Sequence, residues 1–354
     1  MLKARECVAA MRAYESPVNT PECRLRLDLN ESTTGCSPRV AAKFRSMDAK
    51  SIAFYPAREP GEKLVADFLG LGAEQVMLTN GADEGIDLLC RAFLEPDDEM
   101  VIVTPAFSMY EIFAQATGAK VVKVPATDDF AFPLEGMLKA IGLRTRMLVI
   151  TNPNNPTGAL APRAGIIKLL QAAPEAAVLV DEAYFDFCGE TVVDQIGKIN
   201  NLFIARTFSK AYGLAGLRLG VLAGAGEHIS AIRRLCSPFN INAFAMECLA
   251  EALADRDFVA AYTAQVRTSR EWLRAQMESL GFQCWPSHAN FLLVRLGERR
   301  EAILAELRAR GISLRNRPDC AGCVRITIGT QDEMELLVSE MKQVLNKTSA
   351  RMGQ

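Results

Sequence analysis

The sequence has few histidines, no long apolar run and no excess of charge of either sign. His228 and His288 are its only histidines, which is too few for most metal sites and hydrolytic triads, so we expect no metal. No uncharged apolar run approaches the roughly 20 residues that span a bilayer. The formal net charge of -2 provides no field that would attract nucleic acid or an anionic membrane. We therefore expect a soluble globular protein with neither partner.

Several motifs of other enzyme classes are also missing. The chain contains no G-x-x-x-x-G-K-[ST] phosphate loop, no G-x-G-x-x-G after the first strand and no G-x-S-x-G nucleophile turn. Charges interrupt the apolar residues of the N-terminal segment, so we predict no signal peptide. The ten cysteines are scattered, which favours reduced thiols and a cytoplasmic location. Cys320 and Cys323 have C-x-x-C spacing, but without two further zinc ligands nearby we interpret them as ordinary reduced cysteines.

Short apolar strands alternate with helical segments through the middle of the chain. Of the 354 residues, 49% are hydrophobic, enough for one large domain or two of ordinary size. Between the apolar runs lie helical stretches such as 84–94 and 165–172. This pattern predicts an α/β fold with a doubly wound, mostly parallel sheet that is buried on both faces. The apolar runs are 75–79, 99–105, 120–125, 146–151, 176–181, 201–206 and 218–224.

The pattern changes after Pro238 to that of a smaller α+β domain. A charged amphipathic helix is expected from about Ala243 to Leu280. The segments that follow predict strands at 290–296, 312–316 and 323–329 and helices at 301–311 and 333–346. We therefore divide the chain into an N-terminal arm that packs with the small domain (1–45), a large domain (46–242) and a small C-terminal domain (243–354).

Polar residues follow four of the predicted strands of the large domain. They are found in the segments NGADEG, NPNNPTG, DEAY and RTFSK. Ligands of open α/β sheets bind at the carboxyl ends of the strands, and the glycine turn before a helix in NGADEG suits a phosphate. Each segment alone could be a capping turn, a proline-stiffened loop or a solvated lysine. Together they predict a single ligand site.

Pyridoxal phosphate has the chemistry that matches these residues. Its aldehyde needs a lysine, its pyridine nitrogen an anionic partner, and its phenolic oxygen hydrogen-bond donors. Its ring suits an aromatic side chain, and its phosphate suits backbone N–H, hydroxyl and guanidinium groups.

The chain resembles the fold type I aminotransferases, and among them the histidinol-phosphate aminotransferases. The segment NPNNPTG is common to several aminotransferase subgroups, whereas RTFSKAYGLAGLRLG together with GADEG is narrower. The resemblance implies pyridoxal-phosphate-dependent amino transfer between L-glutamate/2-oxoglutarate and histidinol phosphate/imidazole-acetol phosphate, a step of histidine biosynthesis. It covers nearly the whole chain through the segments LDLNES, YP, GADEGIDLL, PAFSMY, NPNNPTG, DEAYFDF, RTFSKAYGLAGLRLG, SPFNIN and VRITIGT.

The same resemblance implies roles for individual residues at the cofactor. Lys210 would bind the cofactor aldehyde and then shuttle the proton, and Asp181 would pair with the pyridine nitrogen. Asn155 and Tyr184 would bond the phenolic oxygen, and Phe107 would stack on the ring. The groups expected to bind the phosphate are the backbone N–H groups of Ala82 and Asp83, the hydroxyls of Ser209 and Thr207, and the guanidinium of Arg218.

On the substrate side the resemblance implies that Arg325 binds the anionic end of both amino partners. Arg315, Tyr14 and Asn30 would assist it. The family pattern NEN-proline reads NESTTG here, a departure in the loop beside the substrate. Tyr55 resembles the tyrosine that reaches the phosphate in the neighbouring subunit, which implies a homodimer with shared active sites.

Three other functions agree with parts of the same sequence. An aromatic or broad-specificity aminotransferase would have the same cofactor residues. Threonine-phosphate decarboxylases share the asparagine loop but differ in the lysine segment. A transcription regulator built on this fold would carry an N-terminal winged-helix domain, which the short arm cannot supply.

Overall fold

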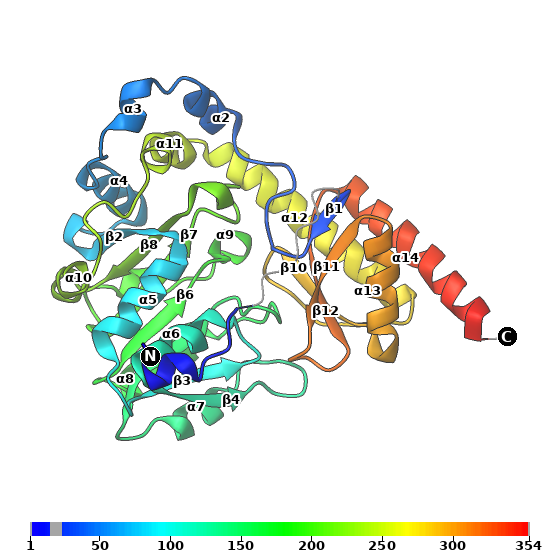
Figure 1. The fold of residues 1–354 in the computed structure, drawn as a ribbon, viewed down its shortest axis with the longest axis horizontal. Helices are drawn as coiled ribbons and strands as arrows, with labels where there is room; N and C mark the ends of the chain where they lie inside the picture. Colours follow the sequence, from blue (N-terminus) through cyan, green and yellow to red (C-terminus); the bar gives the residue numbers. More distant parts are fainter. Residues whose placement is uncertain (1, 15–22, 353–354) are drawn as a thin grey trace.

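Seven strands form the larger of two sheets in the computed structural model, which describes residues 2–14 and 23–352. Their order is β2-β8-β7-β6-β5-β3-β4 (Figure 1). Strand β8 runs antiparallel to both neighbours, and the other neighbouring pairs are parallel. The expected mostly parallel sheet is confirmed. Its strands are β2 (Val76–Asn80), β3 (Glu99–Thr104), β4 (Lys120–Pro125), β5 (Thr145–Thr151), β6 (Ala177–Asp181), β7 (Leu202–Thr207) and β8 (Leu219–Gly224).

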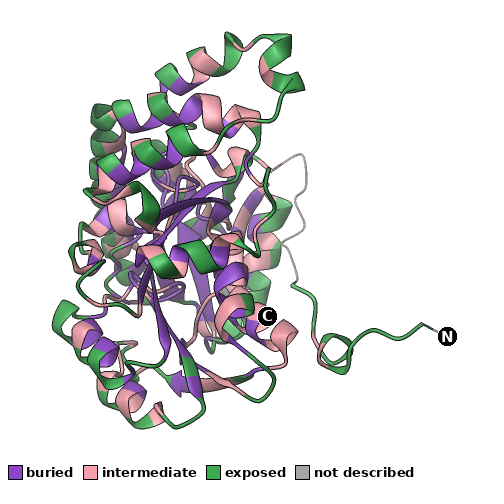
Figure 2. Ribbon diagram, turned by 90° about the vertical axis from the view of Figure 1, so that its left-hand side faces the viewer, coloured by how far each residue is buried: buried purple, intermediate pink, exposed green. Residues whose placement is uncertain are grey.

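Both faces of this sheet are buried, as the continuous apolar strands require. Along β6, Val178 and Val180 belong to the apolar cluster on one face, whereas Ala177 and Leu179 belong to the cluster on the other. Figure 2 shows the strands as buried and the outer sides of the helices as exposed. The helices that precede or connect these strands, or follow the last of them, are α4 (Glu59–Leu69), α5 (Gly81–Phe93), α6 (Met109–Thr117), α7 (Leu134–Ala140), α8 (Arg163–Ala172), α9 (Phe185–Cys188) and α10 (Gly226–Arg233).

The second sheet has the strand order β1-β11-β12-β10-β9. Strand β1 comes from the N-terminal arm and pairs in parallel with β11, with Leu25 opposite Ile312 (Figure 1). The other neighbouring pairs are antiparallel. The elements of this part are β1 (Leu25–Leu27), β9 (Gln283–Cys284), β10 (Phe291–Arg295), β11 (Ile312–Arg317), β12 (Cys323–Thr327), α12 (Arg256–Ser279), α13 (Arg300–Ala309) and α14 (Gln331–Met352).

The arm contacts both parts of the molecule. Its strand β1 lies in the small sheet, helix α2 (Pro38–Arg45) packs on α11 (Ala243–Ala254), and helix α1 (Glu6–Ala9) contacts α6. A further helix, α3 (Ala49–Ala53), follows α2. The division of the chain at 45 and 242 stays a prediction. No helix within residues 2–14 and 23–352 has the length and apolar character needed to cross a membrane.

The prediction of one helix from Ala243 to Leu280 is wrong, because the structure has two helices here. Helix α11 ends at Ala254, and α12 begins at Arg256. Asp255 lies between them with ψ 62° and accepts a hydrogen bond from the backbone N–H of Phe258 at 3.4 Å. An aspartate that caps a helix N-terminus satisfies a backbone group that would otherwise lack a partner. The amphipathic pattern alone could not show this break.

Candidate active site

The polar residues at the strand ends meet around one cavity of about 390 Å³. The strand register explains this, because Thr151 of β5 lies opposite Asp181 of β6, and Asp181 lies opposite Ala205 of β7. The loops that follow these strands therefore begin at one edge of the sheet. Every expected site residue except Tyr55 lines the cavity, namely Tyr14, Asn30, Ala82, Asp83, Phe107, Asn155, Asp181, Tyr184, Thr207, Ser209, Lys210, Arg218, Arg315 and Arg325.

Lys210 lies in the turn after β7, and its side chain lines the cavity. Its Nζ donates a hydrogen bond to the backbone carbonyl of Leu29 at 3.0 Å. Burial, and next the positive charge of Arg325, lower the pKa of Lys210 to about 8. Glu31 and Asp83 act in the opposite direction. Near neutral pH a useful fraction of this amine is therefore unprotonated and able to act as a nucleophile or base.

Asp181 ends β6 and is only 4% exposed. Its Oδ2 accepts a hydrogen bond from the Tyr110 hydroxyl at 2.5 Å, and its Oδ1 accepts one from the backbone N–H of Ala183 at 2.9 Å. Burial raises the pKa of Asp181 to about 6. Among the described residues no lysine, arginine or histidine forms an ion pair with it. A protonated pyridine nitrogen would supply the cationic partner that this buried carboxylate lacks.

The part of the cavity beside the N-terminus of α5 has groups that suit an anion. Helix α5 begins at Gly81, and no side chain caps its first N–H groups. Arg218 has a left-handed φ of 53°, and its Nη2 lies 3.0 Å from Asp83 Oδ2. Gly220 brings β8 close to this helix, because a Cβ there would lie 2.6 Å from the backbone nitrogen of Ala82. Free N–H groups, a helix dipole and a guanidinium together suit a phosphate.

Arg325, on β12 of the small sheet, makes hydrogen bonds to the asparagine loop that follows β5 and to the N-terminal arm. Its Nη1 donates to Asn155 Oδ1 at 2.6 Å, and its Nη2 donates to the carbonyl of Asp28 at 2.7 Å. Its Nε, however, is buried and has no hydrogen-bond partner among the described residues. The side chain is almost fully buried, and burial lowers its pKa to about 10. A buried guanidinium with an unused donor is a site for an anionic ligand.

Asn30 connects the arm to the same wall of the cavity. Its Nδ2 donates to the Tyr184 hydroxyl at 2.9 Å, and its backbone N–H donates to Thr327 Oγ1 at 2.9 Å. Its φ is 55°, a left-handed conformation that asparagine tolerates better than most residues. Arg315 Nη2 donates to the Tyr14 hydroxyl at 3.2 Å, and its guanidinium lies 5.7 Å from the centre of the Tyr14 ring. The arm therefore forms one side of the site.

The sequence analysis missed five polar residues that also line the cavity: Glu31, Ser108, Tyr110, Thr151 and Arg317. Tyr110 follows Phe107 by three residues, and the two rings meet edge to face at 5.7 Å between centroids. Helical spacing in the segment PAFSMY could have indicated this pair. Arg317 lies two residues after Arg315 on β11, so alternation along a strand could have indicated it.

Tyr55 does not line the cavity of its own chain. It is 75% exposed, and its ring stacks on Phe239 with 4.0 Å between centroids. A contribution of Tyr55 to the site of a neighbouring subunit stays a prediction.

Comparison with known proteins decides the family. A model of the aminotransferases of class I and II matches residues 24–341. The chain belongs to this family. The histidinol-phosphate aminotransferase of Roseiflexus castenholzii is 35% identical over 90% of this chain and 89% of its own length. That of Desulfitobacterium hafniense strain Y51 is 36% identical over 96% and 97%, respectively. The solved structure of the Sinorhizobium meliloti histidinol-phosphate aminotransferase, in complex with pyridoxal-5'-phosphate, is 25% identical, covers 98% of both chains and superposes with a TM-score of 0.89.

These findings confirm the expected fold type I architecture, the activity class and the cofactor. The chain is a pyridoxal-phosphate-dependent aminotransferase. The cavity of this aminotransferase fits the cofactor: it has an amine with a lowered pKa, a buried carboxylate without a cation, and a helix N-terminus beside an arginine. Its substrates are small molecules, which agrees with a cavity of this size.

Proposed function

We propose that this aminotransferase moves an amino group reversibly between L-glutamate/2-oxoglutarate and histidinol phosphate/imidazole-acetol phosphate. The observation that carries the proposal is the group of arginines, Arg315, Arg317 and Arg325, at the small-sheet side of the cavity. Glutamate presents a carboxylate and histidinol phosphate presents a phosphate ester. A buried guanidinium with a free Nε donor can bind either anion in alternate half-reactions. The similarity to the histidinol-phosphate aminotransferases of Roseiflexus and Desulfitobacterium supports the same reaction.

We assign proton transfer to Lys210 and electrostatic control to Asp181. Bound pyridoxal phosphate supplies an aldehyde that reacts with amines and a ring that withdraws electrons from the reacting carbon. Lys210 Nζ would hold the cofactor until an amino substrate displaces it. With its lowered pKa the released amine can take the proton from the substrate carbon and return it later. Asp181 keeps a proton on the pyridine nitrogen because its carboxylate is buried and negatively charged.

The remaining cavity residues orient and bind the cofactor in this proposal. Asn155 and Tyr184 would donate to its phenolic oxygen, and Phe107 would cover one face of its ring. The residues assigned to its phosphate are Ala82, Asp83, Thr207, Ser209 and Arg218, which surround the N-terminus of α5. Asn30, Tyr14 and Arg315 would position the substrate beside Arg325.

We also propose that the protein is a homodimer with shared active sites. Exposed apolar side chains form a surface that we call the aromatic patch, and Tyr55 lies within it. Large exposed apolar patches on a protein surface mark interaction sites, and a second copy of this chain would bring Tyr55 to the partner's cavity. The patch consists of Phe54, Tyr55 and Phe239, of which Tyr55 and Phe239 stack on each other.

The ten cysteines are free thiols, as expected for a cytoplasmic enzyme.

The substrate assignment can be tested by single half-reactions. The purified, cofactor-loaded enzyme is mixed with histidinol phosphate, phenylalanine, tyrosine or phosphothreonine at equal concentrations, and the change in cofactor absorption is followed. We expect the fastest reaction with histidinol phosphate. A preference for phenylalanine or tyrosine would favour an aromatic aminotransferase. Release of carbon dioxide from phosphothreonine would favour the decarboxylase.

The role of Arg325 can be tested by Arg325→Gln. The substitution should raise KM for both glutamate and histidinol phosphate by at least about tenfold, because each loses a charge-assisted hydrogen bond. Arg308→Gln, at an exposed position of α13, is the matched control and should leave both values unchanged. If KM rose for only one of the two substrates, the proposal that Arg325 binds both would be contradicted.

A further inference from the structure

Tyr110 has no role in the function proposed above, although its side chain is among the most deeply buried in the protein. It belongs to the first turn of α6 and is 1% exposed. Its hydroxyl lies 2.5 Å from Asp181 Oδ2 and 3.0 Å from Thr151 Oγ1. One hydroxyl thus connects the carboxylate at the end of β6 with the hydroxyl at the end of β5.

When Asp181 is ionised, this chain of hydrogen bonds allows only one arrangement of its protons. A carboxylate only accepts hydrogen bonds, so the Tyr110 hydroxyl must donate its single proton to Asp181. Tyr110 can then only accept from Thr151, whose hydroxyl donates to it. The other oxygen of Asp181 is held by the backbone N–H of Ala183. Both oxygens of the carboxylate therefore have a donor that is fixed by the fold.

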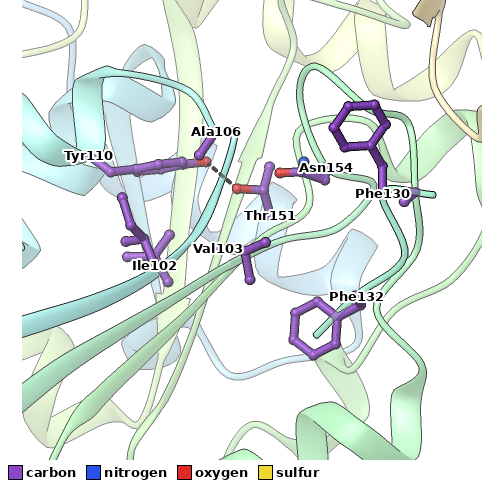
Figure 3. Close-up of a pocket in the computed structure, with 10 residues that line it drawn as sticks. Ile102, Val103, Ala106, Tyr110, Phe130, Phe132, Thr151 and Asn154 are labelled. Carbon is purple, nitrogen blue, oxygen red and sulfur yellow. Dashed lines mark hydrogen bonds between the residues drawn. The ribbon is translucent and has the colours of Figure 1, made fainter. Parts of the chain in front are cut away.

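Tyr110 and Thr151 also separate the cofactor cavity from a second, much smaller cavity. Both residues line the two cavities, and the small one has room for a single water molecule at most, at about 10 Å³. Figure 3 shows the Tyr110 hydroxyl bonded to Thr151, with apolar side chains around the small cavity. Removal of the Tyr110 hydroxyl would leave Asp181 Oδ2 without the donor that the fold supplies.

We propose that Tyr110, supported by Thr151, is a positioning residue that keeps Asp181 ionised and in one orientation, so that the site selects a cofactor with a protonated ring nitrogen. The inference rests on the proposed function only in taking pyridoxal phosphate as the ligand of this cavity. Other groups that act on Asp181 are Asp83 of α5 and Glu182, whose negative charges favour its protonated form. Tyr184, buried on the same side, is also coupled to it. Against these acidic groups and burial, the donors Tyr110 and Ala183 favour the ionised form.

The test compares Tyr110→Phe with the wild type in binding two ligands by equilibrium dialysis, with no amino substrate present. One ligand is pyridoxal phosphate, and the other is its analogue with C–H in place of the ring nitrogen. At neutral pH we expect Tyr110→Phe to bind pyridoxal phosphate about tenfold more weakly, because a charge-assisted hydrogen bond within the pair is lost. Binding of the analogue should change by less than about twofold. The midpoint of the pH dependence of pyridoxal phosphate binding should move upward by about one pH unit.

Thr151 provides a second and independent pair of variants. Thr151→Val has nearly the same shape but no hydroxyl, so it should weaken pyridoxal phosphate binding in the same direction, by about two- to threefold. Thr151→Ser keeps the donor and should restore the wild-type preference. Tyr262→Phe is the matched control, because Tyr262 is a buried tyrosine outside the cavity. It should leave the affinity for both ligands unchanged.

The inference would be overturned if Tyr110→Phe weakened both ligands equally or left the pH midpoint in place. If Tyr110→Phe did not fold, as judged by circular dichroism, the Thr151 pair would decide, and equal binding by Thr151→Val and Thr151→Ser would overturn it. Failure of the wild type to bind pyridoxal phosphate would overturn this inference and the proposed function together. A wrong assignment of the amino substrate would leave every result of this experiment unchanged.

Discussion

At the scale of single residues, burial shifts the two central titratable groups toward their neutral forms. It lowers the pKa of Lys210 to about 8 and raises that of Asp181 to about 6. Charged groups in a poorly solvated site are costly unless a ligand or partner compensates them. In the arrangement proposed here, the cofactor would offer a partner to each: an aldehyde for the amine and a pyridine nitrogen for the carboxylate. Binding of the cofactor would then relieve the free-energy cost of burying these two groups.

The first prediction is that Asp181→Asn stabilises the cofactor-free protein increasingly as pH rises. Because the folded-state pKa of Asp181, about 6, is above its ordinary value of 3.8, the native state binds more protons than the unfolded state between these values. Its contribution to stability is lost as pH rises through this window. The difference in free energy of unfolding between variant and wild type should grow by about 2 kcal/mol from pH 4 to pH 7. Urea denaturation at several pH values measures it, and a difference independent of pH would contradict it.

The second prediction concerns Lys210→Ala, which removes the amine assigned to the cofactor. Dialysis should strip pyridoxal phosphate from the variant, and the absorption band of the bound cofactor should disappear. Transamination should fall by at least about 1000-fold, because covalent binding and proton transfer are both lost. Lys198→Ala, at an exposed position, serves as the control. If the variant kept the absorption band of the bound cofactor after dialysis, Lys210 would not be the residue that binds the cofactor aldehyde.

At the scale of elements, a buried ion pair holds the ends of β6 and β7 together. The Glu182 side chain is fully buried and accepts hydrogen bonds from Arg206 Nε at 3.0 Å and Nη2 at 2.8 Å. It also accepts from Thr191 Oγ1 and from the backbone N–H of Val192. Asp181 precedes Glu182, and Lys210 follows Arg206 in the next turn. The ion pair therefore holds together the two strand ends that carry Asp181 and Lys210.

The third prediction follows from this ion pair. Glu182→Ala leaves the largely buried guanidinium of Arg206 without its carboxylate partner and should lower the free energy of unfolding by about 3 kcal/mol. The pair of Lys63 and Asp67 on α4 is exposed on both sides, so Asp67→Ala should cost less than about 0.5 kcal/mol. Urea denaturation of both variants makes the comparison. Equal losses in free energy of unfolding would contradict a larger contribution from the buried pair.

For the molecule as a whole, the main feature is the aromatic patch, which a single chain leaves exposed to solvent. Tyr55 and Phe239 stack on each other while more than half of each side chain remains exposed. A dimer would bury this surface and, in the arrangement proposed here, give each cavity a residue from the other subunit. Such an interface is the same patch on both subunits when it is related by a two-fold axis.

The fourth prediction is that Tyr55→Ala and Lys210→Ala chains, each expected to impair the shared site, complement each other. In a heterodimer of Tyr55→Ala and Lys210→Ala chains, one site has an intact Lys210 and receives an intact Tyr55. The other site carries both changes. After random reassociation of equal amounts, about a quarter of the sites should be intact, and activity should recover to about that fraction. Mixing each variant with itself is the control. Heterodimers proven by sedimentation or tagged purification that remained inactive would contradict sharing of the site.

The periodic pattern of the chain predicted the seven strands of the large sheet and the residues at their ends. A short apolar run between turn residues is a local property, and so is a helix that follows a glycine turn. The position of Lys210 after β7 and of Asp181 at the end of β6 could therefore be inferred without coordinates. So could the change to an α+β pattern after Pro238. Where the local signal was continuous, as across Asp255, the prediction of one helix was wrong.

Without coordinates, the amino-acid sequence identified most of the polar side chains of the cavity and the strand or loop that carries each of them. The tertiary structure alone decided that Tyr110 and Thr151 meet Asp181, that Arg317 joins Arg325 at the cavity, and that β1 enters the small sheet. The hydrogen bonds among Tyr110, Thr151 and Asp181 and the pairing of β1 with β11 join residues 41 to 287 positions apart. Strand register and packing between elements, which no local pattern contains, place them within hydrogen-bonding distance.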